Sequence, residues 1–173
     1  MSNDLLLFNS TSHSDSRGFF RELYNKKNFL DLPKFVQSNV SYSKKNVIRG
    51  LHFQSSPFSQ GKFISVIKGK IFDVAVNINK DSKYFGIWKS FILSAENNNQ
   101  LWMSGDYAHG FMALDDENYV LYKTTDFYKK ESEKTILWSD KNLAIEWPIK
   151  DINPIVSDKD QSGLTFKETF TSK

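Results

Sequence analysis

Two short β-strands are predicted by the stretch Phe63-Ile64-Ser65-Val66-Ile67-Lys68-Gly69-Lys70-Ile71-Phe72-Asp73-Val74-Ala75-Val76-Asn77. β-Branched and aromatic residues fill both of its apolar runs, and such side chains pack well on the pleated surface of a sheet. Both runs are short, and the Gly69-Lys70 pair between them is typical of a turn. The stretch therefore favours consecutive antiparallel strands.

The same pattern continues on the C-terminal side of this stretch. Further short runs of this kind occupy residues 88–93, 100–103, 110–114 and 119–125, with a polar turn at 115–118. Many short strands at regular spacing predict a sandwich or a barrel, so the expected fold class is all-β. Helical spacing is weak, and short helical turns are expected only near residues 25–30 and 141–143. Neither segment is expected to be a core helix.

The length and composition of the chain indicate one well-packed domain. With 173 residues it is long enough for one buried core and short for two, so a single domain over residues 1–173 is expected. The aromatic fraction of 15%, to which 15 phenylalanines contribute, again favours strands. With 23 basic and 20 acidic residues the net charge is +3, which predicts neither nucleic acid nor a membrane surface as a partner. Any anionic ligand must therefore be held by local contacts.

Cysteine usage and the first residues bear on location. The chain has no cysteine, which excludes disulfides and thiolate metal sites and makes the cytoplasm the expected compartment. The apolar run at residues 5–8 lacks a basic lead-in and a small-residue cleavage site, so no signal peptide is expected. No segment approaches the roughly 20 apolar residues of a membrane span.

Two of the three histidines lie in apolar runs, where a titratable ring suits proton transfer better than solubility. They are His52 in Arg49-Gly50-Leu51-His52-Phe53-Gln54 and His109 in Tyr107-Ala108-His109-Gly110-Phe111. Strand alternation predicts that His52 and Gln54 share one face, while Arg49 lies on the opposite face.

Lys62, in Gln60-Gly61-Lys62, begins the next predicted strand. A hairpin between the two strands would return it to the same end as His52, where its ammonium could stabilise a developing oxyanion. Together with Tyr122, in Leu121-Tyr122-Lys123, these residues suggest enolate chemistry. The alternative is that His52 is a satisfied core histidine and Lys62 a solvated turn lysine.

A metal site is not expected. Metal sites of double-stranded β-helices often contain a His-x-His pair, a downstream acid and a further histidine, but Gln54 stands where the pair needs its second histidine. His13 lies in a Ser-rich segment that resembles a surface loop, so His52 and His109 lack a third ligand. Nucleophilic, dinucleotide and ATP chemistry are not expected either, because the chain has no cysteine, no Gly-x-Ser-x-Gly, no Gly-x-Gly-x-x-Gly and no Walker pattern.

Over nearly its whole length the chain resembles the dTDP-4-dehydrorhamnose 3,5-epimerase family. The resemblance rests on an ordered series of motifs at residues 15–22, 35–39, 48–54, 60–62, 71–76, 93–97, 108–111, 121–128 and 136–140. It implies a cupin-like double-stranded β-helix, or jelly roll, with few short helices. It also implies a homodimer with exchanged strands and an enzyme without metal or organic cofactor.

The resemblance implies a set of catalytic residues. His52 would be the base that removes a proton beside the C4 ketone of a nucleotide-linked 4-keto-6-deoxy sugar, and Tyr122 the acid on the opposite face. Lys62 would be the cation for the C4 oxygen. A family aspartate that orients the histidine lies in a Ser-x-Lys-Asp pattern, here Ser157-Asp158-Lys159-Asp160, which indicates Asp160 and leaves Asp158 as the alternative.

The resemblance also implies residues that hold the substrate. They are Arg17, Glu22, Gln37, Asn39, Arg49, His109, Tyr128, Glu133 and Lys159. Arginine suits a diphosphate because its fork donates two parallel hydrogen bonds, and Gln and Asn amides can read a base edge. The alternatives are that Tyr122 is a core strand tyrosine and that Arg17 and Glu22 form a surface ion pair.

The implied activity is inversion at C3 and C5 of dTDP-4-dehydro-6-deoxy-D-glucose, through enolate intermediates, to give dTDP-4-dehydro-L-rhamnose. Such an enzyme would serve dTDP-L-rhamnose supply for surface polysaccharide. The sequence leaves open an epimerase for C3 alone, one that takes another nucleotide-linked 4-keto sugar, and a keto-sugar isomerase. A β-sandwich that binds a sugar nucleotide without turnover is the non-enzymatic alternative.

Overall fold

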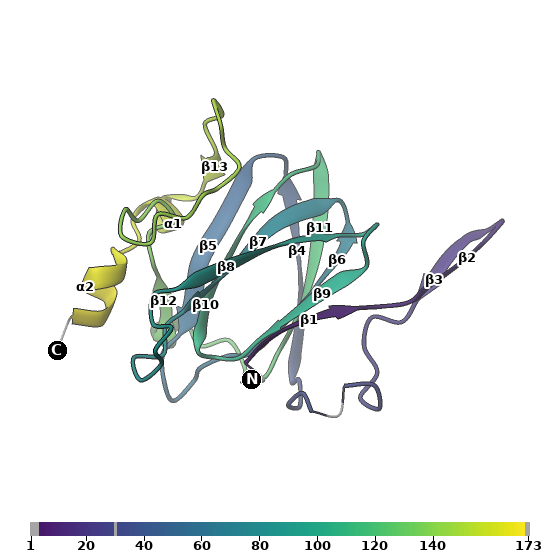
Figure 1. Cartoon of the computed structure of the whole chain (residues 1–173), viewed down its shortest axis with the longest axis horizontal. Coiled ribbons are helices and arrows are strands. Elements are labelled where there is room, and N and C mark those ends of the chain that lie inside the picture. The colour runs from purple at the N-terminus through teal and green to yellow at the C-terminus, as the bar shows by residue number, and fades with distance from the viewer. Residues whose placement is uncertain (1–3, 30, 172–173) are drawn as a thin grey trace.

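Two antiparallel β-sheets pack face to face in the computed structural model, which describes residues 4–29 and 31–171 (Figure 1). The first sheet has the order β1 (Leu5–Asn9), β9 (Asn99–Met103), β6 (Lys62–Lys68), β11 (Glu117–Thr124) and β4 (Gln37–Lys44). The second has the order β12 (Glu133–Thr135), β5 (Val47–Gln54), β10 (Tyr107–Ala113), β7 (Lys70–Asn77) and β8 (Trp88–Ser94). The short strand β13 (Ile155–Val156) also pairs with β5, and this one pairing is parallel. The all-β jelly-roll prediction is confirmed.

Chain connections cross repeatedly from one sheet to the other. Strands β7 and β8 pair with each other, as the sequence predicts, but β5, β6 and β7 alternate between the two sheets. The prediction of hairpins from β5 to β6 and from β6 to β7 was therefore wrong. Crossing at each of these turns lets both sheets bury their inner faces against each other, which an isolated hairpin could not do.

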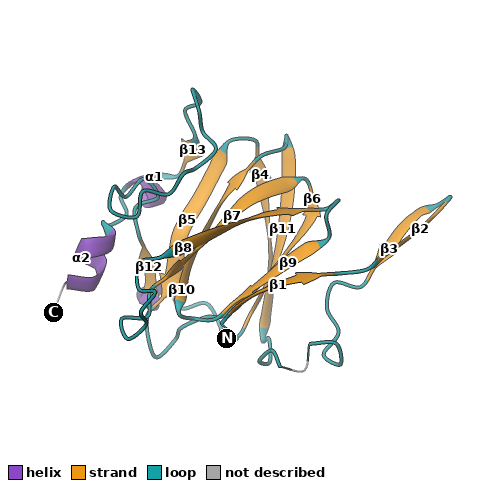
Figure 2. Ribbon diagram, viewed as in Figure 1, coloured by secondary structure: helices purple, strands orange, loops and turns teal. Residues whose placement is uncertain are grey.

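Apolar residues form three layers. Ile64, Leu101 and Phe111 belong to the cluster between the sheets. Val74 and Trp147 belong to a second cluster on the outer face of the second sheet, which the C-terminal segment covers (Figure 2). Because successive residues of a strand point to opposite faces, burial of both faces explains the continuous apolar run of β7.

A third cluster covers the outer face of the first sheet. Phe63 and Trp102 pack there against Leu32 and several aromatic rings of the segment that precedes β4. The hairpin of β2 (Ser12–Asp15) and β3 (Gly18–Arg21) lies apart from these layers and projects from the sandwich (Figure 1).

Helices occur where the sequence analysis did not expect them. Residues 26–28 and 141–144 form turns, and Leu30 of the first expected segment lies outside the described residues. The helices are η1 (Lys130–Ser132), α1 (Asp158–Gln161) and α2 (Phe166–Thr171). Ser157 caps α1 by accepting a hydrogen bond from the Asp160 amide, a local signal that spacing arguments overlook. None of the described helices has the length and apolar character needed to cross a membrane.

A β-bulge in β5 changes which side chains share a face. Opposite β10, His109 pairs with His52 but Phe111 pairs with Arg49, so β5 contains one extra residue between the two pairs. The bulge turns Arg49 to the same side as His52, and the prediction that strict alternation separates them was wrong. Gly50 makes the bulge possible, since its φ is +121° and a Cβ there would lie 2.5 Å from the Gly110 Cα.

Replacing Gly50 should destabilise the fold strongly. Gly50→Ala adds a methyl group against backbone atoms at a positive φ, so we expect a loss of about 3 kcal/mol in unfolding free energy, measured by urea denaturation. Gly18→Ala is the matched control, because Gly18 has a φ of +131° but no atom within 4 Å of the added Cβ. Equal losses for the two variants would contradict the steric account of the bulge.

Candidate active site

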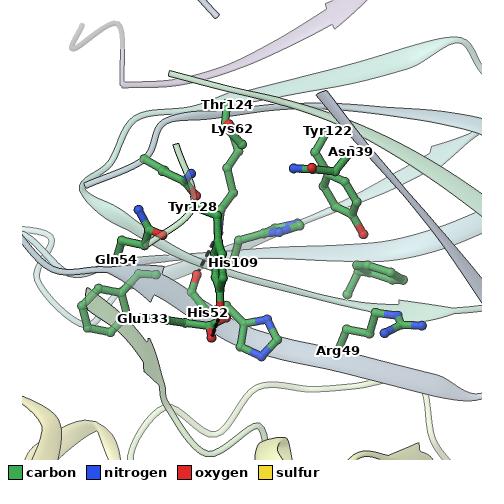
Figure 3. A pocket seen from close by; sticks show the side chains of 13 residues that line it. Asn39, Arg49, His52, Gln54, Lys62, His109, Tyr122, Thr124, Tyr128 and Glu133 are labelled. Atoms are coloured by element: carbon green, nitrogen blue, oxygen red, sulfur yellow. Dashed lines mark hydrogen bonds between the residues drawn. The ribbon is translucent and has the colours of Figure 1, made fainter. Parts of the chain in front are cut away.

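A cavity of about 200 Å³ opens between the two sheets. Figure 3 shows that side chains from both sheets converge on it. It is lined by Asn39, Arg49, His52, Phe53, Gln54, Gln60, Lys62, His109, Phe111, Tyr122, Thr124, Tyr128 and Glu133. Eight of the residues that the sequence analysis singled out are in this lining, so most of the predicted set lies together.

His52 is bonded to a carboxylate behind it. Its Nε2 lies 2.6 Å from Oδ1 of Asp160, whose Oδ2 accepts a hydrogen bond from the Gly50 amide at 3.1 Å. Burial alone would raise the pKa of Asp160, but the hydrogen bonds from His52 and Gly50 and the charge of Lys159 lower it below its usual value. An ionised Asp160 keeps the proton on Nε2 and leaves Nδ1 free to accept one. The structure thus favours Asp160 over Asp158 as the histidine's partner.

Lys62 approaches His52 from the opposite sheet. Its Nζ donates to the backbone carbonyl of His52 at 2.9 Å (Figure 3). Burial lowers the pKa of Lys62 to about 8, although the charges of Asp73 and Glu133 oppose this shift. Near neutral pH the side chain of Lys62 is therefore a cation inside the cavity. It reaches His52 from the opposite sheet and not through the expected hairpin.

Tyr122 faces the cavity from the first sheet. Its hydroxyl is hydrogen-bonded to Ser41 of the neighbouring strand β4, and its ring packs partly against the inner apolar cluster. Burial raises the pKa of Tyr122 to about 12, against the opposing effects of the Ser41 hydrogen bond and the Arg49 charge. The phenol is thus protonated at neutral pH. Since Tyr122 and His52 belong to opposite sheets, they can meet a ligand from two sides.

A second histidine–carboxylate pair lies deeper in the cavity wall. Nε2 of His109 lies 2.8 Å from Oδ2 of Asp73, and both side chains are buried. His109 was among the site residues predicted from the sequence, but Asp73 was not. The signal that could have indicated Asp73 was an acidic residue inside the apolar strand β7, because a charged side chain is rarely buried without a partner.

Polar contacts join the rim of the cavity to the helix that carries Asp160. Glu133 accepts hydrogen bonds from the Tyr128 hydroxyl at 3.0 Å and from Nζ of Lys159 at 2.6 Å. Burial would raise the pKa of Glu133, but these two donors lower it below its usual value. Lys159 therefore lies beside the cavity without lining it.

The amides near the rim also contact each other. Gln37 donates to the Asn39 side chain at 2.9 Å and accepts from the Tyr128 amide at 3.2 Å. Arg49 donates to Ser43 and to the Tyr42 carbonyl, each at 2.9 Å. These bonds fix the orientation of the donors and acceptors that a ligand would meet.

Arg17 and Glu22 lie away from the cavity of the same chain. Arg17 is in the turn between β2 and β3, where it pairs with Asp15 at 2.5 Å and its side chain is 87% exposed. Glu22 accepts hydrogen bonds from Asn25 and Asn28. The two residues do not form an ion pair with each other, so the surface-pair alternative does not describe them.

The acidic and histidine side chains of the cavity do not form a metal site. In residues 4–29 and 31–171, no three His, Asp or Glu side chains gather in a way that could hold a metal ion. The two cavity histidines are each bonded to one aspartate, an arrangement that orients a ring for proton transfer.

Comparison with known proteins reveals the family. The family model for dTDP-4-dehydrorhamnose 3,5-epimerase matches residues 2–168. The chain is 48% identical over 167 residues to the dTDP-4-dehydrorhamnose 3,5-epimerase of Shigella flexneri, covering 94% of this chain and 91% of that protein.

Solved structures agree with this relationship. The enzyme of that name from Bacillus anthracis str. Ames, with TDP and PPi bound, is 44% identical with a TM-score of 0.89, covering 95% of this chain and 97% of the other. The dTDP-6-deoxy-D-glucose-3,5-epimerase of Legionella pneumophila, in complex with dTDP-4-keto-L-rhamnose, is 40% identical with a TM-score of 0.89, covering 97% and 89%. The chain therefore belongs to the dTDP-4-dehydrorhamnose 3,5-epimerase family.

Proposed function

We propose that this protein inverts C3 and C5 of dTDP-4-dehydro-6-deoxy-D-glucose and so produces dTDP-4-dehydro-L-rhamnose. The observation that carries the proposal is the convergence on one cavity of His52, which is bonded to Asp160, from the second sheet and of Tyr122 and Lys62 from the first. The names of its relatives support the same reaction. In this proposal the whole chain forms one domain and acts in the cytoplasm. Its product would supply dTDP-L-rhamnose for surface polysaccharide.

Each inversion follows from two groups on opposite faces of one carbon. Nδ1 of His52 removes the proton beside the C4 ketone, and the resulting carbanion is delocalised as an enolate. The Lys62 ammonium stabilises the charge on the C4 oxygen, and the Tyr122 phenol returns a proton from the other face. General acid–base catalysis typically increases the rate by a factor of about 10²–10⁴, so electrostatic stabilisation of the enolate by Lys62 must contribute as well.

The rim residues suit the nucleotide part of the substrate. Arg49 can donate to the diphosphate, and Gln37 and Asn39 present amides for the base. Tyr128 offers an exposed ring for stacking, and its hydroxyl is already bonded to Glu133. His109 and Lys159 complete the set of polar groups around the sugar.

In a homodimer, Arg17 and Glu22 could contact the substrate in the cavity of the partner subunit. The β2–β3 hairpin projects from the sandwich with Phe19 and Phe20 exposed at 63% and 70%. Strand β4 is an edge of the first sheet and exposes Val40 at 62%. An exposed edge invites pairing with another chain, so we place the hairpin of one subunit along β4 of its partner, close to the partner's cavity.

Exchange of substrate protons with D₂O tests the reaction. Incubation with dTDP-4-keto-6-deoxyglucose in D₂O should place deuterium at both C3 and C5, as read by NMR and mass spectrometry. Label at C3 alone would indicate a C3 epimerase, a displaced carbonyl would indicate an isomerase, and no label would indicate a binding protein.

Two tyrosine variants sharpen this test. Tyr122→Phe keeps the ring and removes the proton donor, so product formation should fall by about 10²-fold or more. Tyr84→Phe, at an exposed tyrosine in the loop before β8, should keep the wild-type rate. Equal rates for the two variants would remove Tyr122 from the mechanism.

The charge on Lys62 predicts an alkaline limit to activity. The ammonium is present below a pKa of about 8 and is lost as the pH rises through that value, so kcat should decline above about pH 8. Lys62→Arg stays charged in this range, and whatever activity remains should not show the decline. A wild-type kcat that stays constant through this range would contradict the role of the cation.

Mixing two inactive variants tests the shared site. In a dimer of Arg17→Ala with His52→Asn, one of the two cavities has both residues intact, so an equal mixture should recover about a quarter of wild-type activity. A mixture of His52→Asn with Tyr122→Phe is the control, because these two residues line one cavity of the same chain. No recovery in the first mixture would show that Arg17 does not act across the interface.

A further inference from the structure

Asp73 is a fully buried carboxylate that the proposed reaction does not use. Its side chain is 0% exposed and lies on the inner face of β7. Oδ2 is bonded to His109, whereas Oδ1 has no hydrogen-bond partner within residues 4–29 and 31–171. A buried carboxylate with one unpartnered oxygen is unfavourable unless positive charge lies nearby.

The charged and titratable groups of the cavity that His109 lines beside Asp73 come from several elements. They are His109 on β10, Lys62 on β6, Tyr122 on β11, His52 and Arg49 on β5, Glu133 on β12, and Asp160 on α1 behind His52. His52 is paired with Asp160, and Arg49 is bonded to Ser43 and Tyr42. Glu133 is paired with Lys159.

Lys62 is the cation left to balance Asp73. The one hydrogen bond of its ammonium to the described part of the chain goes to the neutral carbonyl of His52, and no carboxylate in that part lies within salt-bridge distance of it. The charge of Asp73 raises the pKa of Lys62 and that of Tyr122, against the burial that lowers the first. By raising both pKa values, the charge of Asp73 helps to keep Lys62 and Tyr122 protonated, which is the state that each needs at the start of a turnover.

We propose that Asp73 is a positioning residue of the epimerase, which keeps the Lys62 ammonium charged inside the cavity and holds His109 by its Nε2. This inference rests on the proposed function for its catalytic meaning. The bond to Nε2 leaves Nδ1 of His109 as the ring nitrogen that can bond a ligand. The field of the carboxylate acts on Lys62 without contact, so the amine stays charged where the enolate oxygen forms.

Asp73→Asn removes the charge and keeps the shape. The asparagine oxygen can still accept from His109, so the fold of the site is preserved while the negative charge is lost. The alkaline decline of kcat should move to lower pH by about one unit, because Lys62 then loses its proton more easily. Asp116→Asn, at an exposed residue in the turn before β11, is the matched control and should leave the pH profile unchanged.

A direct titration of Lys62 makes the test independent of turnover. Reductive methylation with ¹³C-formaldehyde labels the amines, and the signal that Lys62→Arg lacks identifies Lys62 in NMR spectra. Its midpoint should lie near 8 in the wild type and about one unit lower in Asp73→Asn. Identical midpoints would overturn the proposal, even if the wild-type enzyme epimerises its substrate as proposed.

A second variant covers the case in which Asp73→Asn does not fold. His109→Gln removes the imidazole but keeps the charge of Asp73, so the midpoint of Lys62 should not fall. A lower midpoint in this variant would show that His109, and not Asp73, sets the charge of the lysine, and would overturn the assignment.

Discussion

Close packing of Gly50 against Gly110 is the constraint on which the site depends. Because neither residue has a side chain, β5 and β10 approach closely enough for the bulge to form. The bulge turns Arg49 toward the cavity beside His52, and the Gly50 amide donates to the carboxylate that orients that histidine. One backbone contact thus sets the position of the diphosphate donor proposed above, of the base and of the base's partner.

The jelly-roll connections give the cavity its chemistry. Successive strands supply opposite walls, so His52, the proposed base, comes from the second sheet, and Tyr122 and Lys62, the proposed acid and cation, come from the first. The same arrangement removes Lys62 and Tyr122 from water, which lowers the pKa of Lys62 to about 8 and raises that of Tyr122 to about 12, so the two values move apart. Asp73, from a third strand, limits the first of these shifts.

The sequence predicts the strands well because their signals are local. Residues 71–76 place apolar side chains on both faces of β7, each of which is covered. The Ser-x-Lys-Asp pattern indicates Asp160, whose carboxylate is hydrogen-bonded to His52, 108 residues away. The bulge at Gly50 was not predictable in this way, since its cause is a contact with Gly110 on another strand. Lys62 was expected at the right place for the wrong reason, because spacing cannot distinguish a hairpin from a crossing between sheets. Asp73 was missed, because its partner lies on a different strand.

The distance along the chain between His52 and Asp160 has a kinetic consequence. The partner of the base is held by a four-residue helix in the C-terminal segment, outside the two sheets. Such a segment can detach by local opening at a lower free-energy cost than unfolding of the barrel. On heating, the enzyme should therefore lose activity at a lower temperature than that at which the sheets unfold. Thermal inactivation would then measure detachment of the C-terminal segment, and calorimetry would measure unfolding of the two sheets.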